Sequence, residues 1–557
     1  MRNIAGVSPS KNSNSHLEWL RNEIDKHSLV TRAQRNVLTP GGEIARWSFD
    51  FRPLLTNAET LDAICELFWK RVAAGGKFQV GGLETASILL VAGMILKAKS
   101  HGRSMSGFYV RKSRSKDGFQ KQMEGNISDA RIVLLDDILN TGSSFMRQIR
   151  LLEAEGRKID TVCSIVRFRD EAFYTYFKEH GIKIISLFTL DDFPRTGGMK
   201  SFGSAKPDVI RYPFKIEWKF QSQDPVYFHS GPKSAPVIDD ARIYFGTDNG
   251  SLWALNQNDG SVVWERKTSF NLRARRCFSS PALLGESVFF GAHDGNLYAL
   301  DAATGHVRWS YQGADRICSS PCVAEDLHTI YVGLAFELWK KKGGIIALDA
   351  HTGEKKWQHT FSSEIHSSPA YDSEHKSVVI GSDEGVHCFD ATSGTSKWLC
   401  KTKGPVNGSF AIDADQEIVS FGSFDTHIYI VDIRDGSIVH TIETFGPISS
   451  TPCIKNGRLY IGLQDKRVLC ADITNGNILW TFSSQSRIFS TPEFIEGMLY
   501  IGSNDGRLYG LDPVKGTHLE SFQATERIVN KIAFNSSTKR IFLPSFANEI
   551  HCLAHYN

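Results

Sequence analysis

The sequence has no apolar run long enough to cross a membrane. Its longest run, residues 88–96, falls short of the ~20 residues that a spanning helix needs and is typical of a buried helix. The first residues are rich in Ser and Asn and lack the apolar core of an export signal. We therefore expect a cytoplasmic protein without a membrane segment.

The cysteines lack the spacing of a metal site. Ten are spread along the chain, and no two of them form a CxxC pair. Several occupy apolar strand positions, where cysteine acts as a small buried hydrophobe: Cys163, Cys388, Cys470 and Cys552. The pattern favours free thiols in a reducing compartment and does not support a zinc site.

An excess of one charge sign is also absent. The 64 Lys and Arg residues nearly balance the 61 Asp and Glu residues. The net charge of +3 indicates no polyanionic partner, and we infer no specific nucleic-acid partner. A chain of 557 residues exceeds a single hydrophobic core, which predicts at least two domains.

The most informative segment is residues 131–144, which read RIVLLDDILNTGSS. Residues 132–135 form an apolar run typical of a strand buried on both faces of a parallel sheet. Asp136 and Asp137 follow where such a strand emerges, the usual place for ligands of an open α/β sheet. Backbone amides and hydroxyls of a loop that opens the next helix suit a phosphate monoester. That loop consists of Asn140, Thr141, Gly142, Ser143 and Ser144.

The two carboxylates suit a ribose diol or a hydrated Mg²⁺, so the segment predicts a pocket for a sugar phosphate. The alternative is an ordinary strand-to-helix turn capped by Asp137 or Asn140. The segment resembles the phosphoribosyl pyrophosphate (PRPP) loop of type I phosphoribosyltransferases, with Asn140 in place of the first hydroxyl residue.

Strands and helices alternate around this segment, which predicts an α/β fold with a parallel sheet and helices on both faces. Residues 81–87 precede the apolar helix as a loop suited to hold pyrophosphate on backbone amides. The candidate residues of this loop are Gly82, Leu83, Glu84 and Thr85. Residues 108–118 read as a strand followed by a basic stretch that contains Arg111, Lys112 and Lys116.

Residues 37–193 resemble orotate phosphoribosyltransferase in particular. The basic stretch matches the Arg-Lys and mobile loop of that family by residue type, and Glu124-Gly125 and Asp50-Phe-Arg52 match its motifs. The basic loop departs from the family, because its spacing from Lys112 to Lys116 is one residue longer and its His is missing. Two further features also depart. Arg169 follows Phe168 where the family has Asp-Arg, and residues 38–42 lack the orotate-contacting Lys. The resemblance therefore implies that PRPP handling is better retained than the orotate pocket.

The resemblance implies a Mg²⁺-dependent displacement of pyrophosphate from PRPP by a nitrogen nucleophile, without a protein nucleophile. Asp136 and Asp137 would hold the ribose hydroxyls and the water shell of Mg²⁺. Residues 140–144 would bind the 5′-phosphate, and Arg169 would contact the base. A mobile loop with Arg111, Lys112 and Lys116 would close over pyrophosphate. The resemblance also implies a homodimer, because the family's loop often reaches a neighbouring subunit. The alternative for the basic stretch is a solvated surface loop.

The second half of the chain consists of repeats. Short β-rich segments recur from residue 212 onward with a period of roughly 40 to 48 residues. The clearest copies, residues 244–255 and 499–511, read strand, Asn-Gly or Asp-Gly turn, strand. A Gly-x-x-x-Trp step follows most hairpins, and two repeats carry His440 or Glu520 at the Trp position. The complete steps are Gly260 with Trp264, Gly305 with Trp309, Gly353 with Trp357, Gly394 with Trp398 and Gly476 with Trp480.

Trp218 lies one period before Trp264 and has no hairpin before it. Pairing its strand with the hairpin of residues 541–553 completes one blade from two distant segments and leaves no open edge. We therefore predict an all-β propeller of eight blades. The eight hairpins begin near Tyr244, Val288, Ile330, Val378, Ile418, Leu459, Leu499 and Ile541.

These repeats resemble those of quinoprotein dehydrogenases that bind pyrroloquinoline quinone (PQQ) and of outer-membrane assembly lipoproteins. The quinone enzymes carry a signal peptide and an adjacent cysteine pair, and this sequence has neither. We therefore expect no PQQ cofactor and interpret the Trp residues as packing between blades.

Arginine recurs before the Ser-Ser-Pro or Ser-Thr-Pro motif that marks an inner strand. Repeat symmetry predicts a ring of guanidinium groups at one mouth of the central channel, which is a candidate anion site. The alternative is a solvated rim, and the acidic Glu364 interrupts the series. The ring would comprise Arg276, Arg316, Arg487 and Arg527, with Arg275 nearby.

The sequence thus predicts an N-terminal helical and polar extension (1–36), a phosphoribosyltransferase-like α/β domain (37–200), a linker (201–213) and the propeller (214–557). Two functions stay open. One is a phosphoribosyltransferase that acts on a base, with the propeller as a sensing or docking module. The other is a non-catalytic PRPP- or nucleotide-binding protein, for example in stress or defence, whose propeller recruits a partner.

Overall fold

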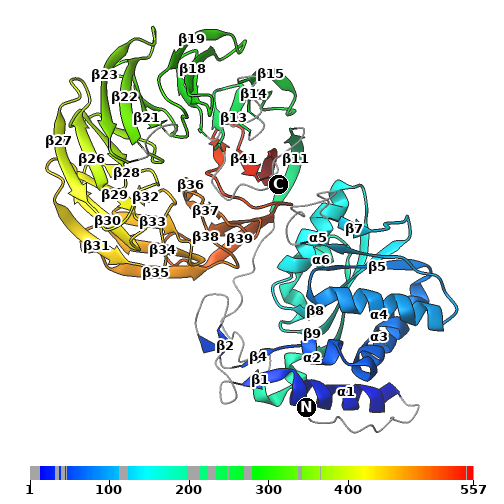
Figure 1. Ribbon diagram of the computed structural model, residues 1–557. Coiled ribbons are helices and arrows are strands. Elements are labelled where there is room, and N and C mark those ends of the chain that lie inside the picture. The colour runs from blue at the N-terminus through cyan, green and yellow to red at the C-terminus, as the bar shows by residue number, and fades with distance from the viewer. Residues whose placement is uncertain are drawn as a thin grey trace. The chain divides into compact units, whose positions relative to one another are not determined.

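The protein is described by a computed structural model that covers residues 13–31, 37–38, 44–45, 47–111, 123–196, 213–222, 234–247, 250–268, 279–336, 342–363, 365–546 and 548–555. The chain divides into two compact units, Met1–Arg211 and Tyr212–Asn557 (Figure 1). Among the helices of the described ranges, none is both long and apolar enough to span a bilayer.

A six-stranded sheet forms the centre of the first unit. Its spatial order is β10 (Lys183–Thr189), β9 (Ile159–Arg167), β8 (Arg131–Leu139), β5 (Phe78–Leu83), β6 (Gly107–Val110) and β7 (Met123–Gly125). Neighbouring strands are parallel except for the antiparallel β6–β7 pair. The central strand β5 is buried along its whole length, and β8 is buried from Ile132 to Asp136, as a sheet covered on both faces requires.

Helices cover the two faces of this sheet (Figure 1). The long helices α3 (Ala58–Val72) and α4 (Ala86–Ser100) pack on one face, where Ile64, Met94 and Val133 belong to the same core. Asn57 caps α3 because its side chain accepts hydrogen bonds from the amides of Glu59 and Thr60. The other face carries α5 (Ser143–Ala154) and the short α6 (Thr175–Glu179).

The segment that the sequence separates as an N-terminal extension packs onto this core. Helix α1 (Ser13–His27) buries Leu20 and Ile24 in the cluster that α3 and α4 also share. Strand β1 (Leu29–Thr31) pairs with β4 (Trp47–Phe49), and the Trp47 indole donates a 2.9 Å hydrogen bond to the Thr196 carbonyl. The remaining elements of this unit are β2 (Val37–Leu38), β3 (Ile44–Ala45), α2 (Arg52–Leu55), η1 (Ala73–Gly75), η2 (Glu171–Phe173), η3 (Leu190–Asp192) and η4 (Pro194–Thr196).

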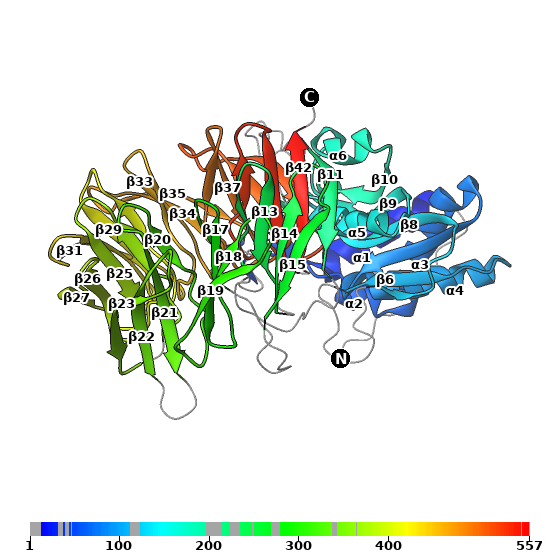
Figure 2. The same ribbon diagram turned by 90° about the horizontal axis from the view of Figure 1, so that it is seen from above.

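The second unit is a propeller of eight four-stranded antiparallel sheets, which Figure 1 shows as a ring and Figure 2 shows from its side. The first four blades are β12 (Val237–Ile238), β13 (Arg242–Gly246), β14 (Ser251–Asn256), β15 (Val262–Lys267); β16 (Ala282–Leu284), β17 (Ser287–Gly291), β18 (Asn296–Asp301), β19 (Val307–Gln312); β20 (Cys322–Ala324), β21 (Thr329–Phe336), β22 (Lys342–Asp349), β23 (Lys355–Phe361); and β24 (Ala370–Asp372), β25 (Ser377–Gly381), β26 (Gly385–Asp390), β27 (Ser396–Lys401).

The other four blades are β28 (Ala411–Asp413), β29 (Ile418–Gly422), β30 (His427–Asp432), β31 (Ile438–Glu443); β32 (Cys453–Lys455), β33 (Arg458–Gly462), β34 (Arg467–Asp472), β35 (Ile478–Ser483); β36 (Glu493–Ile495), β37 (Met498–Gly502), β38 (Arg507–Leu511), β39 (His518–Gln523); and β40 (Ala533–Asn535), β41 (Arg540–Ser545), β42 (Glu549–His555), β11 (Phe214–Gln221). The last blade therefore combines the first strand of the unit with its last three.

Tryptophans of the outer strands join six of the eight blades to the next blade, which confirms the predicted packing role. The Trp264 indole donates a 3.0 Å hydrogen bond to the Ala302 carbonyl of the next blade, and its ring contacts Gly305 of the same turn. Where the repeat has His440 instead, Nε2 lies 2.7 Å from the Thr474 carbonyl oxygen. The equivalent indole bonds are Trp218 to Gln257, Trp309 to Ala350, Trp357 to Ala391, Trp398 to Ile433 and Trp480 to Pro513.

Serine pairs of the Ser-Ser-Pro motifs join the blades at their inner strands. The first hydroxyl of a pair accepts from its own blade, as Ser319 Oγ does from the Gly333 amide at 3.0 Å. The second accepts from the neighbouring blade, as Ser320 Oγ does from the Ser280 amide at 2.9 Å. The motif therefore satisfies buried backbone amides around the channel.

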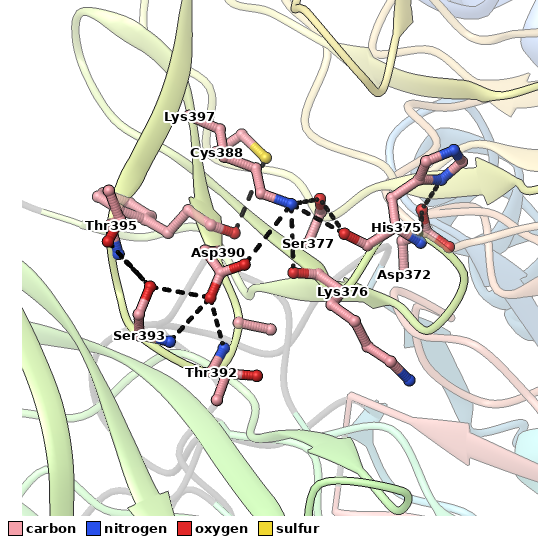
Figure 3. A network of polar contacts seen from close by, with 12 residues as sticks. Asp372, His375, Lys376, Ser377, Cys388, Asp390, Thr392, Ser393, Thr395 and Lys397 are labelled. Carbon is pink, nitrogen blue, oxygen red and sulfur yellow. Dashed lines mark hydrogen bonds and ion pairs between the residues drawn. The ribbon is translucent and has the colours of Figure 1, made fainter.

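A polar network closes the turns of blade four (Figure 3). The Asp390 carboxylate accepts from the amides of Thr392 and Ser393, which fixes the turn before the outer strand. Lys397 on that strand donates to the His375 carbonyl at 2.8 Å and to Ser377 Oγ at 2.9 Å. These bonds stabilise blade four itself and therefore explain its polar residues without a ligand.

An ion pair connects β11 to β42 in the closing blade. Trp218 pairs with Cys552 in the antiparallel ladder, and Lys219 Nζ lies 2.6 Å from Glu549 Oε1. Glu549 Oε2 also accepts from Ser545 Oγ at 2.7 Å and Thr525 Oγ1 at 2.9 Å. The carboxylate is 3% exposed, so these partners compensate its burial.

Candidate active site

The carboxyl ends of three adjacent parallel strands, β5, β6 and β8, bring the candidate residues to one edge of the sheet. Leu83 pairs with Val110, Gly82 pairs with Leu135, and the Glu84 amide donates a 2.9 Å hydrogen bond to the Val110 carbonyl. The turn after β5, the residue after β6 and the acidic pair of β8 are therefore neighbours. Parallel α/β sheets bind ligands at such an edge.

The acidic pair lies within β8, since the strand continues to Leu139 beyond the point at which the sequence predicts its end. Asp136 is 7% exposed and Asp137 is half-buried. The Asp137 amide donates a 3.0 Å hydrogen bond to Asp136 Oδ1. Asp137 is therefore the more accessible carboxylate of the pair.

Gly142 starts α5 in a left-handed conformation with a φ of 80°. Its carbonyl accepts a 2.9 Å hydrogen bond from the Met146 amide. A Cβ at this position would lie 3.2 Å from the Phe177 ring, so both the backbone angle and the close approach favour glycine. Ser143 and Ser144, which the sequence assigned to the loop, form the first turn of α5, and the first amides of a helix have no acceptor within it.

Arg169 and Tyr174 hold the start of the loop at Asn140. The sequence indicated the first of them and not the second. Arg169, the predicted base contact, donates from Nε to Asn140 Oδ1 at 3.4 Å and lies 4.6 Å from the centre of the Phe173 ring. Burial lowers the pKa of Arg169. Tyr174, which the sequence analysis missed, donates from its hydroxyl to the carbonyls of Leu139 and Asn140 at 3.0 and 2.9 Å. No local motif marks Tyr174, because it acts on residues 34 and 35 positions earlier.

Arg111 contacts the acidic residue of the Glu-Gly motif. Its Nε and Nη2 lie 3.0 and 2.9 Å from Glu124 Oε1, across the β6–β7 pair. The hydrogen bond to Glu124 raises the pKa of Arg111, and the charge of Glu84 raises it further. The other basic residues proposed for this loop, Lys112 and Lys116, lie outside the described residues.

The predicted pyrophosphate loop is shorter than the sequence suggests, because Gly82 and Leu83 belong to β5 and only Glu84 and Thr85 form the turn. The Glu84–Thr85 peptide bond is cis. Ser87 donates its hydroxyl proton to the Leu83 carbonyl, and a Cβ on Gly82 would collide with the Ser87 side chain. Close packing between β5 and α4 therefore accounts for the glycine.

The residues present fit a magnesium ion that binds mainly to substrate and water. Asp136 and Asp137 supply hard oxygen donors at the sheet edge, and Glu84 lies in the neighbouring turn. Within the described ranges, no group of three or more His, Cys, Asp or Glu residues forms an all-protein metal cage. The donor set corresponds to the few carboxylates that Mg²⁺ usually takes from a protein when phosphates complete its shell.

Three arginines of the predicted propeller ring occupy equivalent loops. Each precedes an isoleucine whose amide bonds to the preceding blade, at Ile317, Ile488 and Ile528. Arg316 and Arg527 are half-buried and Arg487 is exposed, so the three differ in their surroundings. Arg527 lies 4.1 Å from the centre of the Phe546 ring. Arg275, Arg276 and Glu364 lie outside the described residues.

The first unit is similar to orotate phosphoribosyltransferases. The enzyme of that name from Bradyrhizobium sp. (strain ORS 278) is 24% identical over 162 residues, which span 28% of this chain and 87% of the relative. The one from Pyrococcus furiosus is 26% identical over 168 residues, or 30% of this chain and 88% of the relative. The six-stranded sheet agrees with the phosphoribosyltransferase-like fold that the sequence predicted.

The second unit shares its fold with a quinohemoprotein alcohol dehydrogenase from Comamonas testosteroni, with a TM-score of 0.52, 14% identity and coverage of 63% of this chain and 78% of the other. The repeats match the family described as outer membrane protein assembly factor BamB over residues 215–333, 317–516 and 425–543. Because these segments span more than half of the sequence, the chain belongs to that family through its propeller.

Proposed function

We propose that the first unit is a Mg²⁺-dependent phosphoribosyltransferase that joins the ribose 5-phosphate of PRPP to a nitrogen base and releases pyrophosphate. The observation that supports this most is the convergence of three structures at one sheet edge. These are the acidic pair of β8, the anion-binding start of α5 at Gly142, and the Glu84–Thr85 turn after β5.

The proposed roles follow from the chemistry of each group. The amides at the start of α5 would bind the 5′-phosphate, because backbone donors at a helix N-terminus favour negative charge. Asp136 and Asp137 would orient the ribose hydroxyls, with the more exposed Asp137 nearer to solvent and metal. Bound Mg²⁺ would supply charge neutralisation on the leaving pyrophosphate. Arg111 would add positive charge beside it once its bond to Glu124 is exchanged for the ligand.

The acceptor is proposed to be a base other than orotate. Phe168 stands where orotate enzymes carry an aspartate, and it is 7% exposed. Its ring packs at 5.6 Å from Trp47 and at 5.9 Å from Phe49, measured between ring centres. A carboxylate contact to the base is therefore replaced by an aromatic core, while Arg169 is retained.

Turnover with Mg²⁺, PRPP and a panel of purine and pyrimidine bases, measured as pyrophosphate release, tests the proposal. Release that depends on one base would support it and identify the acceptor. Binding of PRPP without pyrophosphate release for any base would instead favour the second candidate, a non-catalytic PRPP sensor. That candidate is based on the loss of the family's aspartate at Phe168. Absence of PRPP binding by the folded protein would reject both.

The propeller is proposed to act as a docking or sensing module, and the first unit to form a homodimer. The docking role is supported by arginines that recur in equivalent loops, at Arg316, Arg487 and Arg527. The dimer is supported by the similarity to orotate phosphoribosyltransferases alone, and sedimentation of the full chain tests it.

A further inference from the structure

The outer edge of the six-stranded sheet carries a cleft of about 380 Å³ whose lining shares no residue with the proposed active site. Seven consecutive residues, Lys183 to Thr189, line it, and together they are the whole of β10. Successive side chains of a strand point to opposite faces, so a cleft that touches all seven runs along the backbone edge of the strand. β10 is the last strand in the sheet order, with β9 as its partner in the described part of the chain.

A strand edge of this kind can pair with another strand. In a parallel pair, alternate residues direct their N–H and C=O groups away from the partner strand, and those groups remain available for a further strand. β10 spans roughly 20 Å at about 3.3 Å per residue, which is enough to hold one extended segment. Natural sheets usually block such an edge with a bulge, a proline or a covering element, and β10 contains neither a bulge nor a proline.

The charge of the cleft selects the kind of segment. The cleft is lined by three basic residues, Arg71 of α3, Arg167 of β9 and Lys183 of β10. Its two acidic lining residues are Glu171 and Asp192. Asp192 is already engaged, since its Oδ2 accepts from the amide and hydroxyl of Thr189 at 2.7 and 3.1 Å. Within the described ranges, Glu171 is the one carboxylate that pairs with a cation of the cleft, 3.5 Å from Arg167 Nη1.

Arg167 is incompletely satisfied. Its side chain is 13% exposed, and its Nε and Nη1 have no hydrogen-bond acceptor among the described residues. A guanidinium held this way beside a cleft is costly unless further negative charge approaches it. Arg167 pairs with Thr189 at one end of β10, and Lys183 lies at the other, so positive charge is present at both ends of the strand.

We propose that the β10 edge binds an extended acidic segment of a partner protein, which adds to the sheet as a further strand. A segment as long as β10 can place carboxylates about 20 Å apart, which lets them reach the cations at both ends of the strand. Backbone hydrogen bonds would supply affinity, and Arg71, Arg167 and Lys183 would supply selectivity for acidic sequences.

Fluorescence anisotropy of the full chain with a labelled peptide of alternating Glu and Val tests this proposal. We expect saturable binding that Lys183→Glu weakens by about tenfold or more, while Lys178→Glu, an exposed change on α6 outside the cleft, leaves it unchanged. A peptide of alternating Lys and Val should bind the Lys183→Glu variant better than the unmodified chain. Failure of this charge exchange would overturn the proposal.

A second measurement separates strand addition from binding of any anion. Methylation of alternate peptide nitrogens removes the backbone donors but keeps the carboxylates, and it should abolish binding. Equal binding of the methylated peptide would overturn strand addition. Self-association of the chain that Lys183→Glu abolishes would also overturn the proposal, because a second copy of the chain, and not a partner protein, would then occupy the edge. Neither result depends on turnover of PRPP, so this proposal and the proposed function can fail separately.

Discussion

Trp398 of the fourth blade packs directly on Gly436 of the fifth, so that a Cβ added to this glycine would lie 2.7 Å from the indole. The same indole donates a 2.8 Å hydrogen bond to the Ile433 carbonyl in the same turn. The contact recurs around the ring with other Trp–Gly pairs and sets the distance between neighbouring blades.

Gly436→Ala should therefore destabilise the propeller. The change adds a clash with Trp398 to the strain of a φ of 76°, and we expect a loss of about 2–4 kcal/mol in the free energy of unfolding. Gly457→Ala is the matched control, since its φ is 70° and nothing lies within 4 Å of its added Cβ. The control should lose only about 1 kcal/mol. Urea unfolding followed by Trp fluorescence measures both, and equal losses would refute the packing role of Trp398.

Asp137→Asn should impair the first unit without unfolding it. The change removes one negative charge from the sheet edge at nearly constant volume, and we expect PRPP turnover to fall by about 100-fold or more. Asp129→Asn serves as the control, because that carboxylate is 95% exposed and pairs with Arg157 away from the acidic pair. Turnover that survives the first change would remove Asp137 from the proposed mechanism.

Gly142→Ala tests the anion site at the start of α5. Its Cβ would press on the Phe177 ring and shift the first amides of the helix, and we expect PRPP affinity to fall by about 10- to 100-fold. Gly156→Ala, which follows the same helix with a φ of 70° and open space around its Cβ, isolates the backbone strain. Calorimetric titration with PRPP and Mg²⁺ compares the two, and a similar loss in both would show that the loop of Gly142 does not position the phosphate.

Glu549→Gln should weaken blade closure in a pH-dependent way. Burial alone would raise the pKa of Glu549, but its hydrogen bond and charge interaction with His551 and the charge of Lys219 outweigh this and hold the pKa below the usual 4.5. The ionised carboxylate therefore contributes its full stability above pH 4.5 and loses it as the pH falls further. At pH 7 we expect the variant to lose about 3 kcal/mol in the free energy of unfolding, and the difference should shrink at pH 3.

Glu496→Gln is the control for this change. That carboxylate pairs with Lys539 at the surface, where it is 45% exposed, and its loss should cost less than about 1 kcal/mol. Unfolding free energies at both pH values provide the comparison. A difference for Glu549→Gln that stays constant between pH 7 and pH 3 would contradict the depressed pKa.

The propeller was largely predictable because its information is local and repeated. Each hairpin carries its own turn residues, and the unpaired strand of Trp218 indicated how the ring closes. The serine hydrogen bonds between blades were not predictable, since Ser320 accepts from the amide of Ser280, forty residues earlier in the chain. Only the fold brings two such motifs together.

The candidate site was predictable in its residues more than in its geometry. The order of residues 131–144 indicated a strand, an acidic pair and a helix start, and the structure contains all three. Anion binding by this helix start remains a prediction. The strand boundaries were wrong for Gly82, Leu83 and the acidic pair, because an apolar run marks where a strand is buried and not where its ladder ends. Tyr174 could not be found, since its partners are distant in sequence and its hydroxyl bonds to backbone atoms.

The closing blade also constrains how the protein is synthesised. β11 leaves the ribosome before any other strand of the propeller, yet its partner β42 is made only after the seven intervening blades. Throughout that interval the edge of β11 is open, and the growing ring has no means to shut. Cleavage or premature termination anywhere ahead of residue 549 would therefore leave β11 without its ladder partner and exposed to chaperones and proteases, however many complete blades had already folded.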